Sequence, residues 1–321
     1  MTARSAAQPL FVEPSPLQRD VLRTILYFDV FHYPLSPREI YEYLPSNSTS
    51  PAEVHQACVN VPLTFLLRED AGLYYLPQVS GERDPVLDRR ANEQRAKRFM
   101  RIARVMGWII RQFPFVRGVG VSGELSKGVV SPDGDIDFIV VTARRRVWVT
   151  RTLLILFKKV FLFNRKKYFC VNHFIAEDYF AVPEKNRYIA LEIATLAPLF
   201  NASFFRRFVD HNSWIRTYFP NIQSVHTEDA LDAPRGIFQK ILELPLRRAF
   251  GDRLDEYLMG RWRSIWRRRY RHLSDDKLRE LFRTEESIST AYAGDFLSQI
   301  LQEYSKRLAA FGLEEVIGKA P

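Results

Sequence analysis

The chain has 321 residues, a hydrophobic fraction of 46%, an aromatic fraction of 13% and a formal net charge of +10 at pH 7. This length allows two or three domains of roughly 100–200 residues each, and the apolar content argues against a largely disordered chain. No apolar run reaches the ~18 residues of a membrane-spanning helix, which argues against a transmembrane protein. The excess of cations favours a polyanionic partner, such as a nucleotide, a nucleic acid or an anionic membrane surface.

Residues 1–15 are expected to form a flexible tail, because they lack the apolar core of a secretory signal. Cys58 and Cys170 lie far apart and have no metal-ligand spacing. They are expected to be free thiols in a reducing compartment, which predicts a cytoplasmic location.

Residues 16–80 have the pattern of a winged-helix-like module. Ser36 and Ser50 each stand three residues before a glutamate, which is the spacing of a capping box at a helix start. A turn at residues 70–72 then separates two short apolar runs, as in a β-hairpin. The expected elements are three helices and two strands: Leu17–Phe28, residues 37–44, residues 51–60, Phe65–Arg68 and Leu73–Leu76.

The third expected helix lacks the charges that DNA recognition needs. No lysine or arginine lies between Arg38 and Arg68, the interval that contains this helix. Phosphate contacts dominate affinity for DNA and require cationic side chains. The module is therefore expected to contact a protein partner or to serve a structural role rather than to bind DNA.

Residues 81–115 are expected to form a basic connecting helix. Its arginines are interleaved with apolar residues at helical spacing: Phe99, Ile102, Val105, Met106 and Ile109. Residues 116–182 then have the pattern of an α/β unit with a small mixed sheet, and residues 183–321 are expected to be a helical C-terminal region. The main elements expected in these two parts are strands at Val116–Ser122, Ile136–Val141 and Tyr168–Ile175, and helices at Val147–Phe163, Ile189–Leu196, Phe204–Phe208, Gly236–Leu258, Trp262–Tyr270, Asp275–Arg283 and Gly294–Phe311.

One segment combines a glycine turn at Ser122 and Gly123, a nearby Lys127, and the run Asp135-Ile136-Asp137 at the start of an apolar strand. Side chains two positions apart on a strand face the same side, so the two aspartates should converge. Converging carboxylates can hold Mg²⁺ for in-line phosphoryl displacement. The glycine turn lets backbone N–H groups approach phosphate oxygens, and Lys127 adds a cation. The alternative is an ordinary Asp-Gly-Asp turn that enters a strand.

This segment resembles the signature of the DNA polymerase beta-like nucleotidyltransferase superfamily, in which a Gly-Ser turn is followed after a short interval by Asp-hydrophobic-Asp on the next strand. The wider chain is similar to uncharacterised bacterial nucleotidyltransferase-domain proteins, through stretches such as residues 166–172 and Asn212-Ser213-Trp214. The resemblance implies that Asp135 and Asp137 bind a divalent metal, Mg²⁺ or Mn²⁺. It also implies that the Gly123 turn binds the phosphates of a nucleoside triphosphate.

Two departures from that signature bear on activity. Glu124 stands where the superfamily has a phosphate-binding serine, and its carboxylate would repel a triphosphate unless a metal or Lys127 neutralised it. The third acid of the superfamily lies on a later strand, where this chain has Asn172. Asparagine can ligate a metal but cannot accept a proton. The remaining substitutes for the acid are His173, which strand alternation places on the opposite face, Glu177, Asp178, and Glu192 if its helix folds back onto the sheet.

Two dense groups of cations also fit a polyanionic ligand. The first follows the Asp-x-Asp run: Arg144, Arg145, Arg146, Arg151, Lys158, Lys159, Lys166 and Lys167. The second, residues 261–271, interleaves arginines with Trp262, Trp266 and Tyr270, which suits nucleic acid or a membrane interface. The alternative for both is a helix face in water, and helical spacing favours Trp262, Ile265 and Trp266 facing the core.

We therefore predict a Mg²⁺-dependent nucleotidyltransferase that moves a nucleoside monophosphate from a nucleoside triphosphate, expected to be ATP, to a hydroxyl of an unidentified acceptor. Asp135 and Asp137 would hold the metal, while Ser122, Gly123 and Lys127 would seat the phosphates. The alternative is a degenerate, non-catalytic nucleotidyltransferase fold that regulates by binding nucleotide or protein. The two departures favour this alternative, and the intact aspartate pair favours the enzyme.

Overall fold

The computed structural model describes residues 13–46, 49–77, 84–222, 230, 236–291 and 296–317. Within these residues the fold is mixed α/β, as predicted, and has two separate sheets. The chain divides into two compact units. The first contains Met1–Asp88, Arg216–Ile222 and Ile300–Pro321, and the second contains Arg89–Ile215 and Gln223–Gln299. Most of the expected flexible tail, residues 1–12, lies outside the described residues.

The first unit begins with three capped helices, α1 (Pro16–Asp29), α2 (Pro37–Tyr43) and α3 (Pro51–Val59). Each has a serine N-cap, a proline at its first position and a reciprocal capping box with the residue three positions on. The capping box satisfies backbone N–H groups that have no partner within the helix, and proline fixes the first turn. The capping boxes predicted at Ser36 and Ser50 are confirmed.

A short helix and a hairpin follow α3. Helix α4 (Leu63–Leu66) precedes β1 (Arg68–Asp70), which pairs antiparallel with β2 (Leu73–Tyr75). The strand predicted at Phe65–Arg68 is therefore wrong. Leu63 and Leu67 are both buried one helical turn apart while Phe65 is 78% exposed, so this apolar run has the period of a helix.

The part of α13 (Phe296–Ala310) from Ile300 onward completes the first unit. Tyr304 packs edge-to-face against Tyr27 of α1, and Arg307 forms an ion pair with the buried Asp29. The helix predicted at Gly294–Phe311 is confirmed where the structure describes it.

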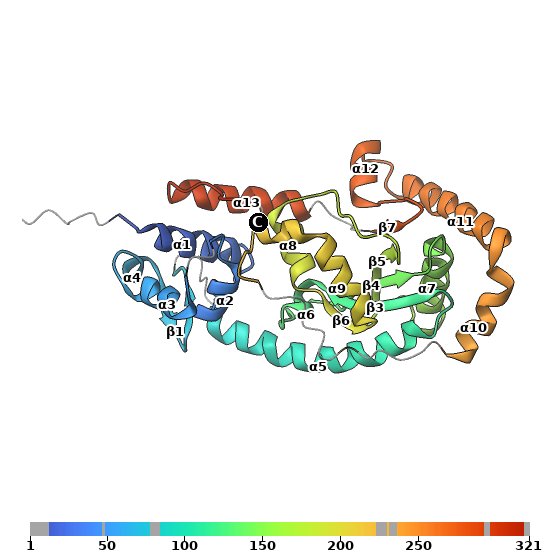
Figure 1. Ribbon diagram of the computed structural model, residues 1–321, viewed down its shortest axis with the longest axis horizontal. Helices are drawn as coiled ribbons and strands as arrows, with labels where there is room; N and C mark the ends of the chain where they lie inside the picture. The colour runs from blue at the N-terminus through green and yellow to red at the C-terminus, as the bar shows by residue number, and fades with distance from the viewer. Residues whose placement is uncertain are drawn as a thin grey trace, which may run out of the picture. The chain divides into compact units, whose positions relative to one another are not determined.

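The second unit is built on a five-stranded sheet in the order β6-β3-β4-β5-β7 (Figure 1). In that order the strands span Ala197–Phe200, Val116–Ser122, Asp137–Thr142, Cys170–Ala176 and Ile288–Thr290. Strands β4 and β5 are parallel, and the other neighbouring pairs are antiparallel. The three central strands are those predicted, although β5 begins two residues later than expected. The edge strands β6 and β7 were not predicted.

Alternating residues of the central strands bury the two faces of the sheet. Val119 and Phe138 join a core cluster with Phe99 of α5 (Pro85–Arg111) and Leu154 of α7 (Val147–Phe161). On the other face, the ring of Phe205 of α9 (Ala202–His211) packs against Gly120. A Cβ atom added to Gly120 would lie only 2.8 Å from Cζ of this ring, so a larger residue would not fit. The predicted apolar stripe of α5 is wrong at Val105, which is 57% exposed; Ala103 and Ile110 are buried instead.

The remaining helices of the second unit are α6 (Gly123–Ser126), α8 (Arg187–Ala194), α10 (Ile237–Glu243), α11 (Arg248–Arg269) and α12 (Asp275–Leu281), with the 3₁₀ turn η2 (Leu244–Leu246). The single helix predicted over Gly236–Leu258 is wrong. Pro245 lies in η2, where its missing N–H interrupts the helical ladder, and α11 begins anew at Arg248. Helix α11 then continues through the segment predicted as a separate helix at Trp262–Tyr270. No helix in the described part of the chain is long and apolar enough to cross a membrane.

Candidate active site

Strand pairing brings three segments of the chain to one end of the sheet. Ser122, the last residue of β3, lies opposite Asp137, the first residue of β4. Cys170, the first residue of the parallel strand β5, also pairs with Asp137. The turn at Gly123, where α6 begins, is therefore beside the start of both other strands.

Two aspartates and a cysteine converge at this end of the sheet. Asp135, Asp137 and Cys170 each offer a potential ligand atom, and these atoms lie within 4.8 Å of one another. The aspartates thus converge as strand alternation predicts. Burial, followed by the negative charge of Asp135, raises the pKa of Asp137 to about 7. Two negative carboxylates this close repel each other, so binding a proton or a cation stabilises the pair.

The sequence did not predict that Cys170 would lie in the site. Its side chain is buried and not in a disulfide. Burial raises the pKa of the thiol above its ordinary value, and the charges of Asp137 and Asp135 raise it further. The thiol therefore carries its proton at neutral pH and hydrogen-bonds to the aspartates. The available sequence signal was its position at the start of an apolar strand, which indicates this neighbour only once the parallel pairing is known.

Two glycines leave room for carboxylates at this end of the sheet: Gly123 in the turn after β3 and Gly134 in the loop before β4. Gly123 has φ +69°, which favours glycine, and a Cβ at this position would stand 2.8 Å from Asp137 Oδ2. Oε2 of the neighbouring Glu124 accepts a hydrogen bond of 2.7 Å from the Ser131 N–H and would lie 2.8 Å from a Cβ on Gly134. Glu124 therefore stabilises the loop that leads to the aspartates. This contact gives a structural reason for glutamate at a position where the resemblance implies serine.

Lys127 and Glu192 meet at the same turn. Lys127 Nζ lies 2.6 Å from Glu192 Oε1 and donates a 3.0 Å hydrogen bond to the Gly123 carbonyl oxygen. The Gly123 N–H donates to Glu192 Oε2 at 3.2 Å. Helix α8, which carries Glu192, thus does fold back onto the sheet. Two groups predicted to bind phosphate, Lys127 and the Gly123 N–H, contact a carboxylate of the protein.

The other candidates for the third acid differ in position. Asn172 donates from Nδ2 to Asp137 Oδ1 at 3.3 Å, so it does face the aspartate pair. Burial, followed by the charge of Arg283, lowers the pKa of His173 to about 4, and a base this weak is largely unprotonated at neutral pH. The Glu177 N–H bonds to the Thr142 carbonyl oxygen at the far end of β4.

Glu177 and Asp178 therefore lie at the opposite end of the sheet from Asp137. Asp178 forms an ion pair with Arg144 there, at 3.1 Å. The suggestion that either acid replaces the missing one is wrong, because a parallel neighbour that starts beside Asp137 ends beside Thr142.

The cluster suits a hard divalent cation through its carboxylates. Oxygen ligands from aspartate are those that Mg²⁺ and Mn²⁺ prefer. Asp135 and Asp137 provide them from positions two residues apart, and a bound cation would relieve the repulsion by which Asp135 helps to raise the pKa of Asp137. The protonated thiol of Cys170 is a poor ligand for Mg²⁺, so the aspartate carboxylates are the groups of this cluster that suit the cation.

The predicted cations near the site separate into two classes. Arg146 is buried and bonds to Asp252 and to the Leu246 carbonyl oxygen, so it has a structural role. Lys167 is exposed, and its Nζ donates to the Pro132 carbonyl oxygen at 3.3 Å in the loop before Asp135. Lys167 is therefore a basic side chain on the loop that precedes Asp135.

Arg151 is also buried, with its guanidinium 5.1–5.3 Å from the ring centroids of Phe174, Trp262 and Trp266. Trp266 is buried and Trp262 partly buried, as predicted, whereas Ile265 is 45% exposed, so its predicted core position is wrong.

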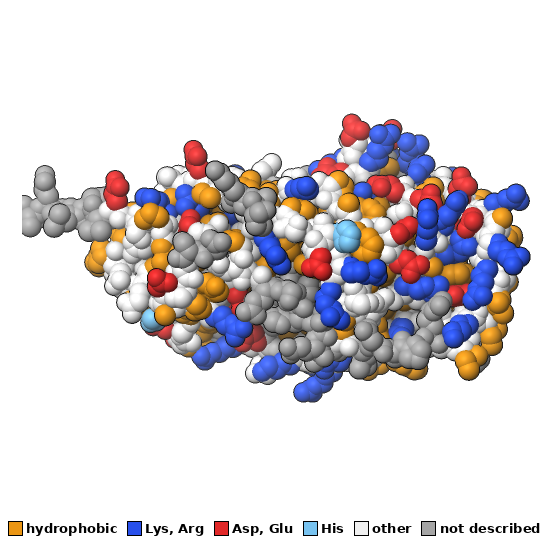
Figure 2. Space-filling model, viewed as in Figure 1, with side chains coloured by type: hydrophobic (Ala, Val, Ile, Leu, Met, Phe, Trp, Pro, Cys, Tyr) orange, Lys and Arg blue, Asp and Glu red, His pale blue; other side chains and the backbone are white. Residues whose placement is uncertain are grey.

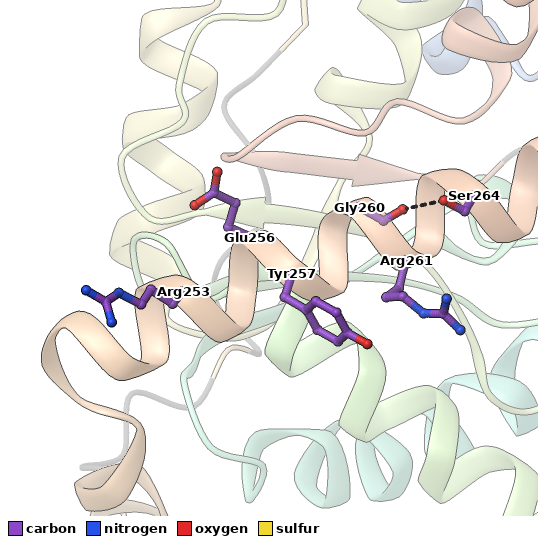
Figure 3. Close-up of a pocket in the computed structure, with 6 residues that line it drawn as sticks. All are labelled: Arg253, Glu256, Tyr257, Gly260, Arg261 and Ser264. Atoms are coloured by element: carbon purple, nitrogen blue, oxygen red, sulfur yellow. Dashed lines mark hydrogen bonds between the residues drawn. The ribbon is translucent and has the colours of Figure 1, made fainter.

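A separate surface recess lies on α11 (Figure 3). Its lining residues recur along one stripe of this single helix: Arg253, Glu256, Tyr257, Gly260, Arg261 and Ser264. Figure 2 shows basic side chains over α11 and α12 with acidic side chains among them, and Arg267 pairs with Asp275 at 3.4 Å. Groups from one helix do not converge on a reacting atom, and we assign no chemistry to this recess.

Comparison with protein-family models, with curated proteins and with solved structures finds no match to this chain.

Proposed function

We propose that this protein is a metal-dependent nucleotidyltransferase. The observation that supports the proposal is the convergence of Asp135 and Asp137 directly beside the positive-φ turn at Gly123. A carboxylate pair next to a tight glycine turn provides a place for a divalent cation and, beside it, a place for phosphate oxygens. The resemblance to the DNA polymerase beta-like superfamily rests on the same residues.

The proposed reaction is an in-line displacement at the α-phosphorus of a nucleoside triphosphate, with ATP as the expected donor. The oxygen of an acceptor hydroxyl forms a bond to this phosphorus and its proton is released to water. The bond to the β-phosphate oxygen breaks, and pyrophosphate leaves with that electron pair. A Mg²⁺ or Mn²⁺ ion held by Asp135 and Asp137 would neutralise the charge of the phosphates. Ser122, Gly123 and Lys127 would position them, and Lys167 would add a second cation.

Glu124 has a structural role in this proposal. Its carboxylate accepts a hydrogen bond from the Ser131 N–H, on the side of the turn that leads to Asp135. Lys127 pairs with Glu192 instead, so neutralisation of Glu124 beside a triphosphate would fall to the bound metal.

The second candidate function is a non-catalytic nucleotide-binding regulator. The observation that favours it is Asn172, whose amide occupies the place beside Asp137 where a third acid would stand. A protein of this kind would bind metal and nucleotide through the same residues but would transfer nothing.

Transfer from α-³²P-labelled ATP separates the two functions. With Mg²⁺, we expect label to enter an RNA, protein or small-molecule fraction offered as acceptor, and pyrophosphate to be released in equal amount. Asp137→Asn should abolish both. Nucleotide binding without transfer to any fraction, and without pyrophosphate release above that of Asp137→Asn, would favour the regulator.

We further propose that the first unit contacts a protein partner through its winged-helix-like part. The exposed residues of α3 include Glu53, His55 and Gln56 and no lysine or arginine, which disfavours DNA. A cytoplasmic location fits the use of ATP and Mg²⁺ and the two free cysteines. An affinity for DNA that falls steeply with salt would contradict the partner assignment.

A further inference from the structure

Helix α8 delivers one carboxylate to the candidate active site from a distant part of the sequence. The Asn186 side chain caps the helix by accepting a hydrogen bond from the Ile189 N–H at 2.9 Å. Leu191 and Ile193 are buried, while Glu192 between them is only partly buried. The packing of its neighbours thus fixes Glu192 on the side of the helix that faces the turn after β3.

Glu192 and Asp137 contact the same residue. The Gly123 N–H donates to Glu192 Oε2 at 3.2 Å, and Asp137 Oδ2 would lie 2.8 Å from a Cβ on Gly123. The two carboxylates therefore both lie next to Gly123, and Asp135 lies close to Asp137. The charge of Glu192 also raises the pKa of Asp137, as expected for neighbouring acids.

The groups that hold Glu192 are those predicted to bind phosphate. Lys127 and Glu192 form a 2.6 Å ion pair with side chains that are 17% and 21% exposed. Phosphate oxygens carry more negative charge than one carboxylate and accept the same hydrogen bonds. A triphosphate at the Gly123 turn would therefore displace Glu192 from the Gly123 N–H and from Lys127, and the released carboxylate would remain next to Asp137.

We infer that Glu192 is the third carboxylate of the metal site and replaces the acid that Asn172 cannot provide. This inference rests on the proposed nucleotidyltransferase function. Glu192 has two positions in this account. Without nucleotide it forms the ion pair with Lys127, and with nucleotide it joins Asp135 and Asp137 as a metal ligand.

The test measures Mn²⁺ affinity by electron paramagnetic resonance of free Mn²⁺, in the presence of a non-hydrolysable ATP analogue. Glu192→Gln keeps the size and hydrogen-bonding capacity of the side chain but removes its charge. We expect it to weaken Mn²⁺ binding by about tenfold or more, the scale on which altered metal surroundings act. The matched control is Glu177→Gln, the same change at the opposite end of the sheet, which should alter affinity less than about twofold.

A compensating change sharpens the result. Asn172 Nδ2 lies 3.3 Å from Asp137 Oδ1, so Asn172→Asp places a carboxylate beside the pair. In the Glu192→Gln background it should restore most of the lost Mn²⁺ affinity. Equal affinities for Glu192→Gln, Glu177→Gln and wild type would overturn the inference while leaving the proposed function in place. Absence of Mn²⁺ binding by the folded wild type would overturn both.

Lys127→Met provides an independent test should Glu192→Gln fail to fold. Without its cationic partner Glu192 is free to reach the metal, so Mn²⁺ affinity measured without nucleotide should rise several-fold. An unchanged or weaker affinity would show that Glu192 only anchors the turn, and would contradict the inference.

Discussion

Two aspartates in the second unit differ in what surrounds them. Asp255 of α11 accepts hydrogen bonds from the Trp148 and Val149 N–H groups, at 2.9 and 2.8 Å, and so satisfies the exposed amides at the start of α7. The hydrogen bonds to Asp137 come from the side chains of Cys170 and Asn172, and its other close neighbour is a second carboxylate.

Burial raises the pKa of both acids, to about 6 for Asp255 and to about 7 for Asp137. For Asp255 the backbone N–H groups oppose the shift, whereas for Asp137 the charge of Asp135 adds to it. The comparison teaches that a raised pKa does not by itself mark a functional acid. The oxygens of a structural acid accept hydrogen bonds from backbone N–H groups. A binding acid lacks such donors and is stabilised when a cation binds.

The largest expected effect is on stability at Asp255. Asp255→Ala should be less stable than Asp255→Asn by about 2 kcal/mol, because alanine leaves two helix N–H groups without an acceptor and asparagine keeps a carbonyl oxygen there. At Asp137 the same pair of variants should differ by less than about 0.5 kcal/mol, since the hydrogen bonds that the described residues make to this carboxylate come from the side chains of Cys170 and Asn172. Urea denaturation of the four variants measures both differences. A gap at Asp137 as large as that at Asp255 would show that the site aspartate is structural.

A smaller effect is expected in the pH dependence of stability. Both acids have folded pKa values above the unfolded value of 3.8, so the folded state holds protons that the unfolded state has lost. Their contribution to the free energy of unfolding is therefore greatest below about pH 4 and is lost as pH rises, through about 6 for Asp255 and about 7 for Asp137.

Variants show which aspartate causes each part of this decrease in the free energy of unfolding. Asp137→Asn should remove the decline between about pH 6 and 7, while Asp255→Asn should leave that part unchanged. Added Mg²⁺ should restore stability above pH 7 in the wild type but not in Asp137→Asn, because a metal binds only the deprotonated acid. Urea denaturation across this range tests the assignment, and a decline that persists in Asp137→Asn would contradict it.

Much of the fold that positions the site could be predicted from local pattern. The strands at Val116–Ser122 and Ile136–Val141 and the convergence of Asp135 and Asp137 follow from two-residue alternation, which the structure preserves. Ser36 and Ser50 marked helix starts because a capping box is formed within four consecutive residues.

The missed features depend on contacts between distant parts of the chain. Strand β6 is short and contains Pro198, which a sheet edge tolerates because its missing N–H group need not be paired. Cys170 enters the site only through parallel pairing of β5 with β4. Glu192 was named as a candidate only if its helix returned to the sheet, and the packing of α8 that brings it back leaves no local signal in sequence.

The most direct test of the central claim is calorimetric titration with ATP, with and without Mg²⁺, of the wild type and of the double variant Asp135→Asn, Asp137→Asn. Asp255→Asn serves as the matched control, since it changes an aspartate of the same unit that also has a raised pKa. We predict Mg²⁺-dependent binding in the wild type and the control, and its loss in the double variant. Mg²⁺-dependent binding that survives in the double variant would contradict it, as would failure of the folded wild type to bind any of the four nucleoside triphosphates.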